Sequence, residues 1–378
     1  MPHHGQAESE TDTHLPTVEP NLLRPHGLGA GAYIFQSNYL QYLKDLLPYP
    51  DRRVEVNIMI QPNSSPHIGT LCNLGVAFVV ARRMADLGME AVVTCDLCDR
   101  AGGEQVAVGG IVYQRTLRDT GSFQRNLPDY QELLQLLSRR YNVPFKLRFE
   151  AELLGSDGMS EILQNIIENR ATLAKFLAPG TGTLAIRAAC PQCGLVDRYG
   201  LKNSYAPDAS SVSFLCPHHG QFTHSTKDSH HFMFNCQLLN LIIGYFYEKS
   251  LHNYIEIIGS DYAGFWQEQL LCRFLSKPMV IVYTPLISDW AGAKVSKSLY
   301  LRGTAYEYLK KAGMDYLLNY RTLRTERRDL GILWHEIERW IDEPYRLFRG
   351  YSIEYIHLLF QGTCQGLLHQ QTERPTME

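Results

Sequence analysis

The stretch VEVNIMIQPNSSPHIGT, residues 54–70, decides the fold. Its apolar run at residues 54–60 is typical of a buried parallel strand, and a polar loop joins this run to the start of an apolar helix pattern. Small and polar residues let a ligand approach the backbone closely, and a helix N-terminus offers free N–H groups and a positive dipole to an anion. The stretch therefore predicts a phosphate site, although no Gly-Lys-Ser/Thr of a Walker loop follows.

A second strand completes the unit. The helix pattern ends near Gly88 in a predicted C-cap, and MEAVVTCDLCD, residues 89–99, again has the apolar run of a buried parallel strand. Strand, helix and strand form a βαβ unit, whose binding edge lies at the C-terminal ends of its strands. We therefore expect residues 61–70 and 95–99 to lie in the same crevice.

Composition sets the protein class. The 378 residues are 45% hydrophobic with a formal net charge of −3, which is enough for a substantial core in two or three subdomains and gives no basic field to attract nucleic acid. The basic run from Arg321, RTLRTERR, is interpreted as a solvated helix face in preference to a phosphate contact. Without an N-terminal signal peptide pattern or a stretch of about 18 apolar residues, we expect a soluble, cytoplasmic protein with no membrane partner.

The pattern of elements predicts an α/β fold of five parts. A flexible tail at residues 1–30 precedes the first half of a Rossmann-like nucleotide-binding domain at residues 31–150. A helical and cysteine-rich insertion at residues 151–250 separates it from the second half at residues 251–302. Residues 303–378 form a helical C-terminal subdomain.

Two knuckles in the insertion share the pattern C-P-x-[C/H]-G. They are CPQCG at residues 190–194 and CPHHG at residues 216–220, and the repeat makes His219 the counterpart of Cys193. Four such ligands on two knuckles predict a tetrahedral structural zinc site formed by Cys190, Cys193, Cys216 and His219, with the glycines allowing the turns beneath the metal. His218 is the competing fourth ligand, and free buried thiols are the alternative to a metal site.

Cys95 and Cys98 form another C-x-x-C pair, at the end of the second predicted strand. Metal binding and redox chemistry are both open to such a pair. No partner knuckle accompanies it in the sequence, so a packing role is the favoured interpretation.

The loop PHIGT at residues 66–70 gains meaning from AKVSKS at residues 293–298. Together they resemble the HIGH and KMSKS signature motifs of class I aminoacyl-tRNA synthetases, in the same order and on the two halves of an α/β fold. Attack of an amino-acid carboxylate on the α-phosphate of ATP needs positive groups that stabilise phosphate charge, and Mg²⁺ accompanies the ATP. The alternative is that His67 only caps a helix and that the lysines are solvated.

The resemblance implies a role for each signature residue. His67 would hydrogen-bond the phosphates, Gly69 would let the adenine approach the backbone, and Lys297, supported by Lys294, would neutralise the leaving pyrophosphate. Thr70 stands where the motif has its last His, and its hydroxyl can still donate a hydrogen bond.

The order of parts is similar to class I lysyl-tRNA synthetases over residues 54–352. A helical segment, EILQNIIENRATLAKFL, leads into the knuckles, and IEIIGSDYAG resembles the family's Gly-x-Asp-His element with Tyr262 in place of His. Lysine or another cationic amino acid is then the favoured substrate, with Asp96, Asp99 and Glu256 as candidate partners for its charge. The sequence ends at Glu378, where we expect the family's anticodon-binding region to begin.

These implied roles define the predicted site. The predicted catalytic residues are His67, Thr70, Lys294 and Lys297. The predicted ATP-binding residues are Pro66, His67, Gly69, Gly259, Asp261, Ser296 and Lys297. The predicted amino-acid-binding residues are Asp96, Asp99, Asp261 and Tyr262.

Three functions remain open at this point. The first is a lysyl-tRNA-synthetase-like ligase that contacts the tRNA acceptor stem. The second is an amide-bond ligase that transfers the adenylate to a small amine, or a related enzyme that consumes charged tRNA in peptide-bond formation. The third is a non-catalytic relative that binds a nucleotide, which the intact His67 and lysines argue against.

Overall fold

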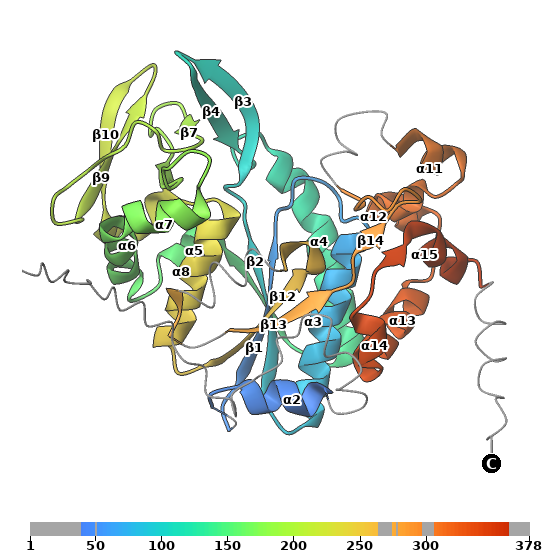
Figure 1. Cartoon of the computed structure of the whole chain (residues 1–378). Coiled ribbons are helices and arrows are strands. Elements are labelled where there is room, and N and C mark those ends of the chain that lie inside the picture. Colours follow the sequence, from blue (N-terminus) through green and yellow to red (C-terminus); the bar gives the residue numbers. More distant parts are fainter. Residues whose placement is uncertain (1–38, 50, 264–273, 277–278, 297–305, 363–378) are drawn as a thin grey trace, which may run out of the picture.

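The fold was analysed in a computed structural model, which describes residues 39–49, 51–263, 274–276, 279–296 and 306–362 (Figure 1). The predicted tail at residues 1–30 and the predicted catalytic residue Lys297 lie outside the described residues.

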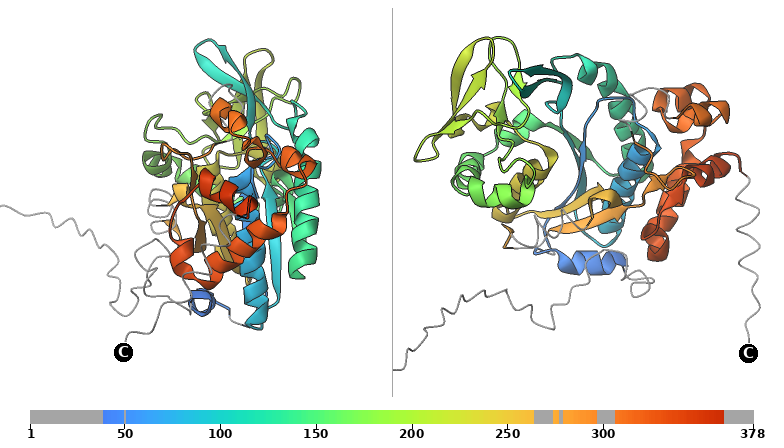
Figure 2. Two further views of the ribbon diagram at one scale, coloured as in Figure 1. Left: turned by 90° about the vertical axis from the view of Figure 1, so that its right-hand side faces the viewer. Right: turned by 45° about the horizontal axis from the view of Figure 1, so that its top comes forward.

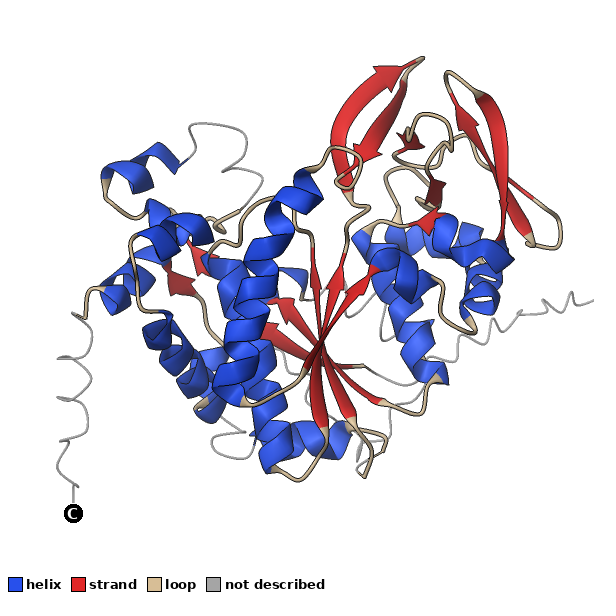
Figure 3. Cartoon of the chain, turned by 180° about the vertical axis from the view of Figure 1, so that it is seen from behind, coloured by secondary structure: helices blue, strands red, loops and turns tan. Residues whose placement is uncertain are grey.

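A parallel sheet forms the centre of the molecule (Figure 3). Its five strands are β1 (Val54–Ile60), β2 (Ala91–Leu97), β5 (Phe145–Phe149), β12 (Asn253–Gly259) and β13 (Val280–Thr284). β1 pairs in parallel with β2 along its whole length, from Val54 opposite Ala91 to Ile60 opposite Leu97. The predicted βαβ unit is confirmed, because helix α3 (Ile68–Asp86) connects these two strands.

The order of strands across the sheet is β13-β12-β1-β2-β5. The chain thus moves outward from β1 through β2 to β5, then returns to the other side of β1 for β12 and β13. This is the order of a doubly wound fold, whose ligands bind where the direction reverses, outside the carboxyl ends of the strands. That point lies between β1 and β12, which pair in parallel from Val54 opposite Asn253 to Ile58 opposite Ile257.

Each face of the sheet has its own hydrophobic core. Val54, Val56 and Ile58 of β1 pack with α3 and α4 (Ser122–Tyr141) in one core. Met59, which points to the opposite face, packs against the other core, formed with α6 (Met159–Glu168) and α8 (Cys236–Lys249). The alternation of strand side chains therefore separates a face covered by α3 from a face covered by α8.

Helix α3 is the one helix of the described residues that is long and apolar enough to cross a membrane by length and composition. The sequence analysis expected no such stretch. The helix has 72% of its most apolar window buried inside the molecule, as a central helix packed on a sheet does.

The insertion follows β5 and returns the chain to the sheet at β12. Besides α6 and α8 it contains α5 (Glu150–Leu154), α7 (Arg170–Leu177), η2 (Thr226–His231) and six short strands. These strands are β6 (Arg187–Ala188), β7 (Val196–Asp197), β8 (Ser204–Tyr205), β9 (Ser211–Cys216), β10 (Gly220–Ser225) and β11 (Phe232–Met233). Sequence analysis did not predict the hairpin β3 (Gly102–Val108) and β4 (Ile111–Thr116), which projects beside the insertion from the same end of the molecule and pairs with β7 (Figure 1).

Apart from the short helix η3 (Ser260–Tyr262), which follows β12, the remaining helices of the described residues gather on one side of the sheet (Figure 2). They are α2 (Tyr39–Leu46), α11 (Glu307–Lys311), η6 (Asp315–Leu317), α12 (Tyr320–Thr325), α13 (Leu330–Asp342), α14 (Pro344–Leu347) and α15 (Ile353–Phe360), with the short strands β14 (Ile287–Ser288) and β15 (Tyr351–Ser352). α13 packs closely on α3 at Gly75, where a Cβ atom would lie 2.6 Å from Ile337 Cδ1 and 3.0 Å from Trp334 Cζ3. Glycine at this position lets the two helices approach.

We expect Gly75→Val to lower the free energy of unfolding by about 1–3 kcal/mol, because the added side chain overpacks the contact between α3 and α13. Gly180→Val is the matched control, since a Cβ at the exposed Gly180 meets no atom within 4 Å. Urea unfolding of both variants measures the difference. Equal stability of the two variants would contradict the close helix packing.

Candidate functional site

A cavity of about 370 Å³ lies at the carboxyl ends of β1 and β12. Its lining comes from the loop after β1, the first turns of α3, the ends of β12 and β13, the start of α8, and the segment around Lys294. This is the position where the strand order predicts a ligand, and the volume lies within the range of sites for small ligands.

His67 is the N-cap of α3 and lines the cavity. Its Nδ1 accepts a hydrogen bond from the Gly69 N–H at 2.9 Å, so a neutral ring carries its proton on Nε2. A Cβ at Gly69 would lie 2.8 Å from His67 Cε1, so glycine makes room for the ring above the helix. The N–H groups of Thr70 and Leu71 both donate to the His67 carbonyl. The prediction of free N–H groups is therefore wrong for these three amides, which leaves the imidazole and the helix dipole to meet an anion.

Three hydrogen bonds hold the loop that carries His67. Asn126 Nδ2 donates to the Pro62 carbonyl at 3.3 Å, and the Tyr130 hydroxyl donates to the Ser64 carbonyl at 3.0 Å. The backbone N–H of the first residue of α12 donates the third bond, to the Pro66 carbonyl, at 2.8 Å. The position of His67 thus depends on α4 and on the C-terminal helices.

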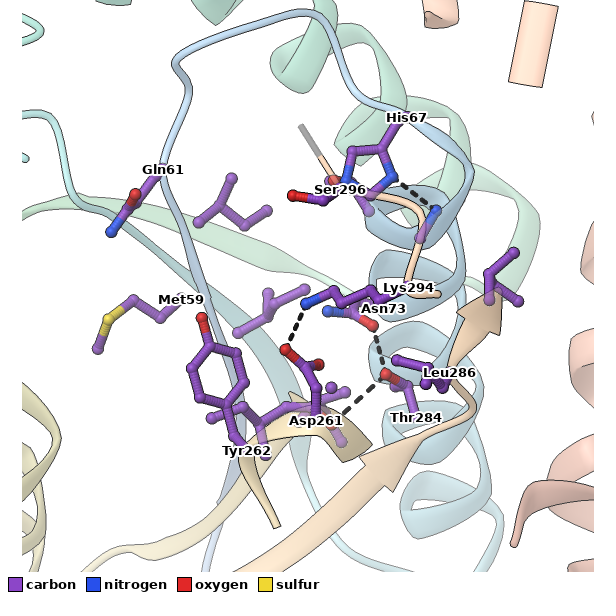
Figure 4. Close-up of a pocket in the computed structure, with 18 of the residues that line it drawn as sticks. Met59, Gln61, His67, Asn73, Asp261, Tyr262, Thr284, Leu286, Lys294 and Ser296 are labelled. Carbon is purple, nitrogen blue, oxygen red and sulfur yellow. Dashed lines mark hydrogen bonds and ion pairs between the residues drawn. The ribbon is translucent and has the colours of Figure 1, made fainter. Parts of the chain in front are cut away.

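Lys294 and Asp261 form an ion pair within the cavity (Figure 4). Lys294 Nζ also lies 5.6 Å from the centre of the Tyr262 ring. Gly259 ends β12, and a Cβ there would lie 2.5 Å from Asp261 Oδ1, so glycine allows the carboxylate to turn back toward the strand. These residues come from the second half of the sheet, whereas His67 comes from the first half.

Backbone pairing with β14 and a hydrogen bond to a tyrosine hydroxyl hold the segment around Lys294. Lys294 bridges to Ser288 of β14, the Val295 N–H donates to Ile287 O at 2.9 Å, and the Ser296 N–H donates to the Tyr306 hydroxyl at 2.8 Å. Ser296 therefore lines the cavity on a segment that is held at both sides.

Figure 4 shows the two halves of the lining, with His67 and Ser296 at one end and Met59, Gln61 and Tyr262 at the other. Of the predicted site residues, the structure brings together His67, Gly69, Thr70, Gly259, Asp261, Tyr262, Lys294 and Ser296 around the cavity. Pro66 precedes them in the loop and is not part of the lining.

Asp96 and Asp99 are not brought to the cavity. Arg148 donates one hydrogen bond to each oxygen of the buried Asp96 carboxylate, at 2.6 and 2.8 Å. Asn57 Nδ2 donates to the same carboxylate at 2.8 Å. Asp99 is buried in an ion pair with Arg118. The prediction that residues 95–99 share a crevice with the His67 loop is therefore wrong, because arginines draw these carboxylates away from it.

Cys95 and Cys98 are both buried, and burial raises the pKa of each thiol well above its ordinary value. Such thiols are poor nucleophiles and poor metal ligands. Their environment is consistent with the packing role favoured from the sequence.

Sequence reasoning missed four polar lining residues, Asn73, Cys236, Asn240 and Thr284, whereas Gln61 and Asn63 belong to the loop that it placed in the crevice. Asn73 lies one helical turn after Thr70 and accepts a hydrogen bond from Thr284 at the end of β13. Its spacing from the PHIGT loop is a signal that could have found it, because residues three apart share a face of a helix. Gln61 Nε2 donates to Cys236 Sγ at 2.9 Å, a contact across 175 residues that no local pattern predicts.

The two knuckles meet in the insertion. Cys190, Cys193, Cys216 and His219 place their ligand atoms within 4.8 Å of one another, so these four residues could hold a metal ion. Cys190 Sγ and Cys216 Sγ lie 3.6 and 3.5 Å from His219 Nδ1, and Cys193 Sγ lies 3.5 Å from Cys216 Sγ. A tetrahedral zinc ion at about 2.0–2.3 Å from each atom requires separations of roughly 3.5–3.8 Å, and the cluster fits it.

The glycine of each knuckle has the positive φ expected of these turns, +73° at Gly194 and +76° at Gly220. His219, and not the adjacent His218, belongs to the cluster. The structure thus brings together the four residues that the repeat of the two knuckles predicts.

No protein-family model and no curated protein matches the sequence. Among solved structures, the chain is similar to a glutamate-tRNA synthetase from Elizabethkingia anophelis, with 12% identity, a TM-score of 0.29, and coverage of 66% of this chain and 53% of that one. It is also similar to a glutamate tRNA ligase from Elizabethkingia meningosepticum in complex with its amino acid, with 13% identity, a TM-score of 0.31, and coverage of 66% and 52%. The arginyl-tRNA synthetase of Thermus thermophilus matches with 11% identity, a TM-score of 0.29, and coverage of 83% and 63%.

The chain thus spans between 52% and 63% of the length of these three proteins. Their names specify glutamate and arginine. The resemblance to lysyl enzymes stays a prediction from the sequence.

We expect the purified protein to contain a single zinc ion, because three thiolates and an imidazole at these separations match its tetrahedral preference. His219→Ala should reduce zinc retention at least about tenfold against a competing chelator, while the matched variant His218→Ala should retain it. Elemental analysis of both variants after chelator treatment makes the comparison. The site would be contradicted if wild-type protein freed of zinc melted at the same temperature as the untreated protein. Equal loss of zinc from the two variants would also contradict it.

Proposed function

We propose that the cavity binds ATP and activates an amino acid as its adenylate. In this reaction a carboxylate oxygen of the amino acid attacks the α-phosphorus, the bond to the bridging oxygen of the β-phosphate breaks, and pyrophosphate leaves. The observation that carries the proposal is that His67 and Lys294 line one cavity at the point where the strand order reverses, although 226 intervening residues separate them in the sequence. The motif resemblance independently assigns both residues to ATP.

The N-terminus of α3 would receive the phosphates. His67 Nε2 is the donor of a neutral ring, and the dipole of a 19-residue helix adds positive potential at its first turn. Thr70 is buried in that turn and lines the cavity, where its hydroxyl supplies another donor. The adenine contact that the resemblance implies for Gly69 is not part of this proposal, because the His67 ring occupies the space beside the Gly69 Cα.

Lys294 would act on the other side of the triphosphate. It is paired with Asp261, so binding of ATP would exchange a carboxylate partner for phosphate oxygens. A fixed cation aimed at charge that develops on the leaving pyrophosphate stabilises the transition state more than the ground state. Lys297 is proposed as a second cation from the same segment, on the basis of the motif alone. ATP would bind as its Mg²⁺ complex, which neutralises part of the phosphate charge.

The amino acid would occupy the end of the cavity lined by Met59, Gln61 and Tyr262 (Figure 4). Two carboxylates line the cavity, Asp261 and Glu256, and both could attract a cation. Lysine or another cationic amino acid is therefore the proposed substrate. Asp96 and Asp99 are not part of this proposal, because neither lines the cavity and each is paired with an arginine.

The acceptor of the activated amino acid is proposed as the 3′ end of a tRNA or a small amine. Both acceptors present a nucleophile to the same adenylate carbonyl. The activation step can be tested without choosing between them.

We expect His67→Ala and Lys294→Ala each to lower kcat for amino-acid-dependent exchange of labelled pyrophosphate into ATP by about 10². Each variant removes a positive group directed at the phosphates, so kcat and kcat/KM should fall together. Lys310→Ala is the matched control, an exposed lysine paired with Glu307 outside the cavity, and it should remain within about twofold of wild type.

The exchange assay is run with each amino acid in turn. Wild-type protein that exchanges pyrophosphate with none of them would refute the activation reaction. Full activity in both His67→Ala and Lys294→Ala would refute the assignment of the reaction to this cavity.

A further inference from the structure

Glu256 differs from the other ionisable residues of the cavity lining in that its carboxyl group is buried and only partly hydrogen-bonded. It lies on β12, its side chain is almost completely buried, and it lines the cavity. The Tyr254 hydroxyl donates to its Oε2 atom. Its Oε1 atom is buried and has no hydrogen-bond partner within the described part of the chain. A buried acceptor without a donor costs free energy, and that cost is removed when a ligand supplies the donor.

The surroundings of Glu256 hold it in a neutral state without a ligand. The pKa of its carboxyl is raised to about 8, chiefly by burial and also by the negative charge of Asp96 on β2, while the Tyr254 hydroxyl and Arg148 on β5 act in the opposite direction. Two other titratable groups belong to the same network: Tyr247 of α8 stacks on Tyr254 at 3.8 Å, and its hydroxyl donates to Glu55 of β1 at 2.8 Å.

The cation of this network, Arg148, already has hydrogen-bond partners. Arg148 donates two hydrogen bonds to Asp96 and a third to the Tyr247 hydroxyl at 3.2 Å. Arg148 and Asp96 do not line the cavity. Glu256 is thus a carboxyl group at the cavity wall for which the network supplies no ion-pair partner.

Asn57 adds a second acceptor beside Glu256. The two residues are opposite each other on the paired strands β1 and β12. Asn57 donates its Nδ2 to Asp96, which leaves its buried Oδ1 atom without a partner in the described structure. Asn57 does not itself line the cavity, so it would act through its proximity to the carboxyl group.

We propose that Glu256 is the residue that selects the substrate, by accepting hydrogen bonds from the cationic end of the amino-acid side chain and losing its proton when that cation binds. The inference rests on the proposed activation reaction. An ammonium or guanidinium group brings both the missing donors and the opposite charge. The Met59 thioether and the Cys236 thiol, which also line the cavity, offer apolar surface to the methylene groups before the cation.

The proton release has a defined direction. Below the raised pKa, Glu256 carries a proton in the free protein, and a bound cation favours the carboxylate, so binding expels that proton. The affinity for lysine should therefore rise as the pH increases from about 6.5 to 8 and then level off, because the ε-ammonium stays charged in this range. A neutral side chain of the same length causes no such change.

The test uses Glu256→Gln, which keeps an acceptor for Tyr254 and removes the charge. Exchange kinetics with lysine and with its neutral analogue norleucine should show the KM for lysine raised by about 10² in this variant, with the KM for norleucine within about threefold of wild type. Glu55→Gln is the matched control, since it makes the same change in the same network but outside the cavity lining, and it should leave the preference for lysine intact. An unchanged ratio of the two KM values in Glu256→Gln overturns the proposal.

Calorimetric titration of lysine into the whole protein gives a test that needs no variant and no catalysis. At pH 7, wild-type protein should release close to a full proton per bound lysine, measured in two buffers of different ionisation enthalpy, and Glu256→Gln should release almost none. Lysine binding without proton release in wild type overturns the proposal, and so does the absence of lysine binding. If lysine binds with proton release but no amino acid supports exchange, the activation reaction fails while the role of Glu256 stands.

Discussion

Strand β1 is hydrogen-bonded to a parallel strand on both sides, and this pairing determines where the molecule can bind a ligand. Parallel neighbours require crossover connections, so the chain leaves β1 through α3 on one face of the sheet and returns to β12 after an insertion packed on the other face. The connection that follows β1 and the insertion that precedes β12 therefore lie on opposite faces of the sheet. The cavity occupies the space between them, with α3 on one side and α8 on the other.

The cavity lining offers different partners to the anionic and cationic groups of the proposed substrates, and this supports a consistent orientation for them. A helix N-terminus, His67 and Lys294 suit the phosphates of ATP, whereas the buried Glu256 suits a cation. An amino acid with a cationic side chain would point its carboxylate toward the phosphates and its charge toward Glu256. Asp261 lines the same cavity and is paired with Lys294. Its partner would change when ATP binds, which couples the two halves of the site.

The parts of this architecture that depend on local patterns could be predicted from the sequence. The βαβ unit followed from two apolar runs around an apolar helix, and His219 followed from the repeat of the two knuckles. The prediction for Asp96 failed because the end of a strand in the sequence indicates only an edge of the sheet. The partner of the Asp96 carboxylate is Arg148, 52 residues away, and no local pattern predicts this ion pair. The hairpin β3–β4 was missed because β3, GGEQVAV, begins with two glycines and shows no alternation of polar and apolar residues. The contact of Gln61 with Cys236 depends on the whole fold and has no local signal.

The central claim is that one triphosphate is bound between the N-terminus of α3 and Lys294. A crystal structure of the protein with a non-hydrolysable ATP analogue and Mg²⁺ tests it most directly. The account predicts phosphate oxygens within hydrogen-bond distance of His67 Nε2 and Lys294 Nζ, with the ion pair between Lys294 and Asp261 broken. A nucleotide bound outside the cavity, or one whose phosphates point away from α3 while that ion pair persists, would contradict it.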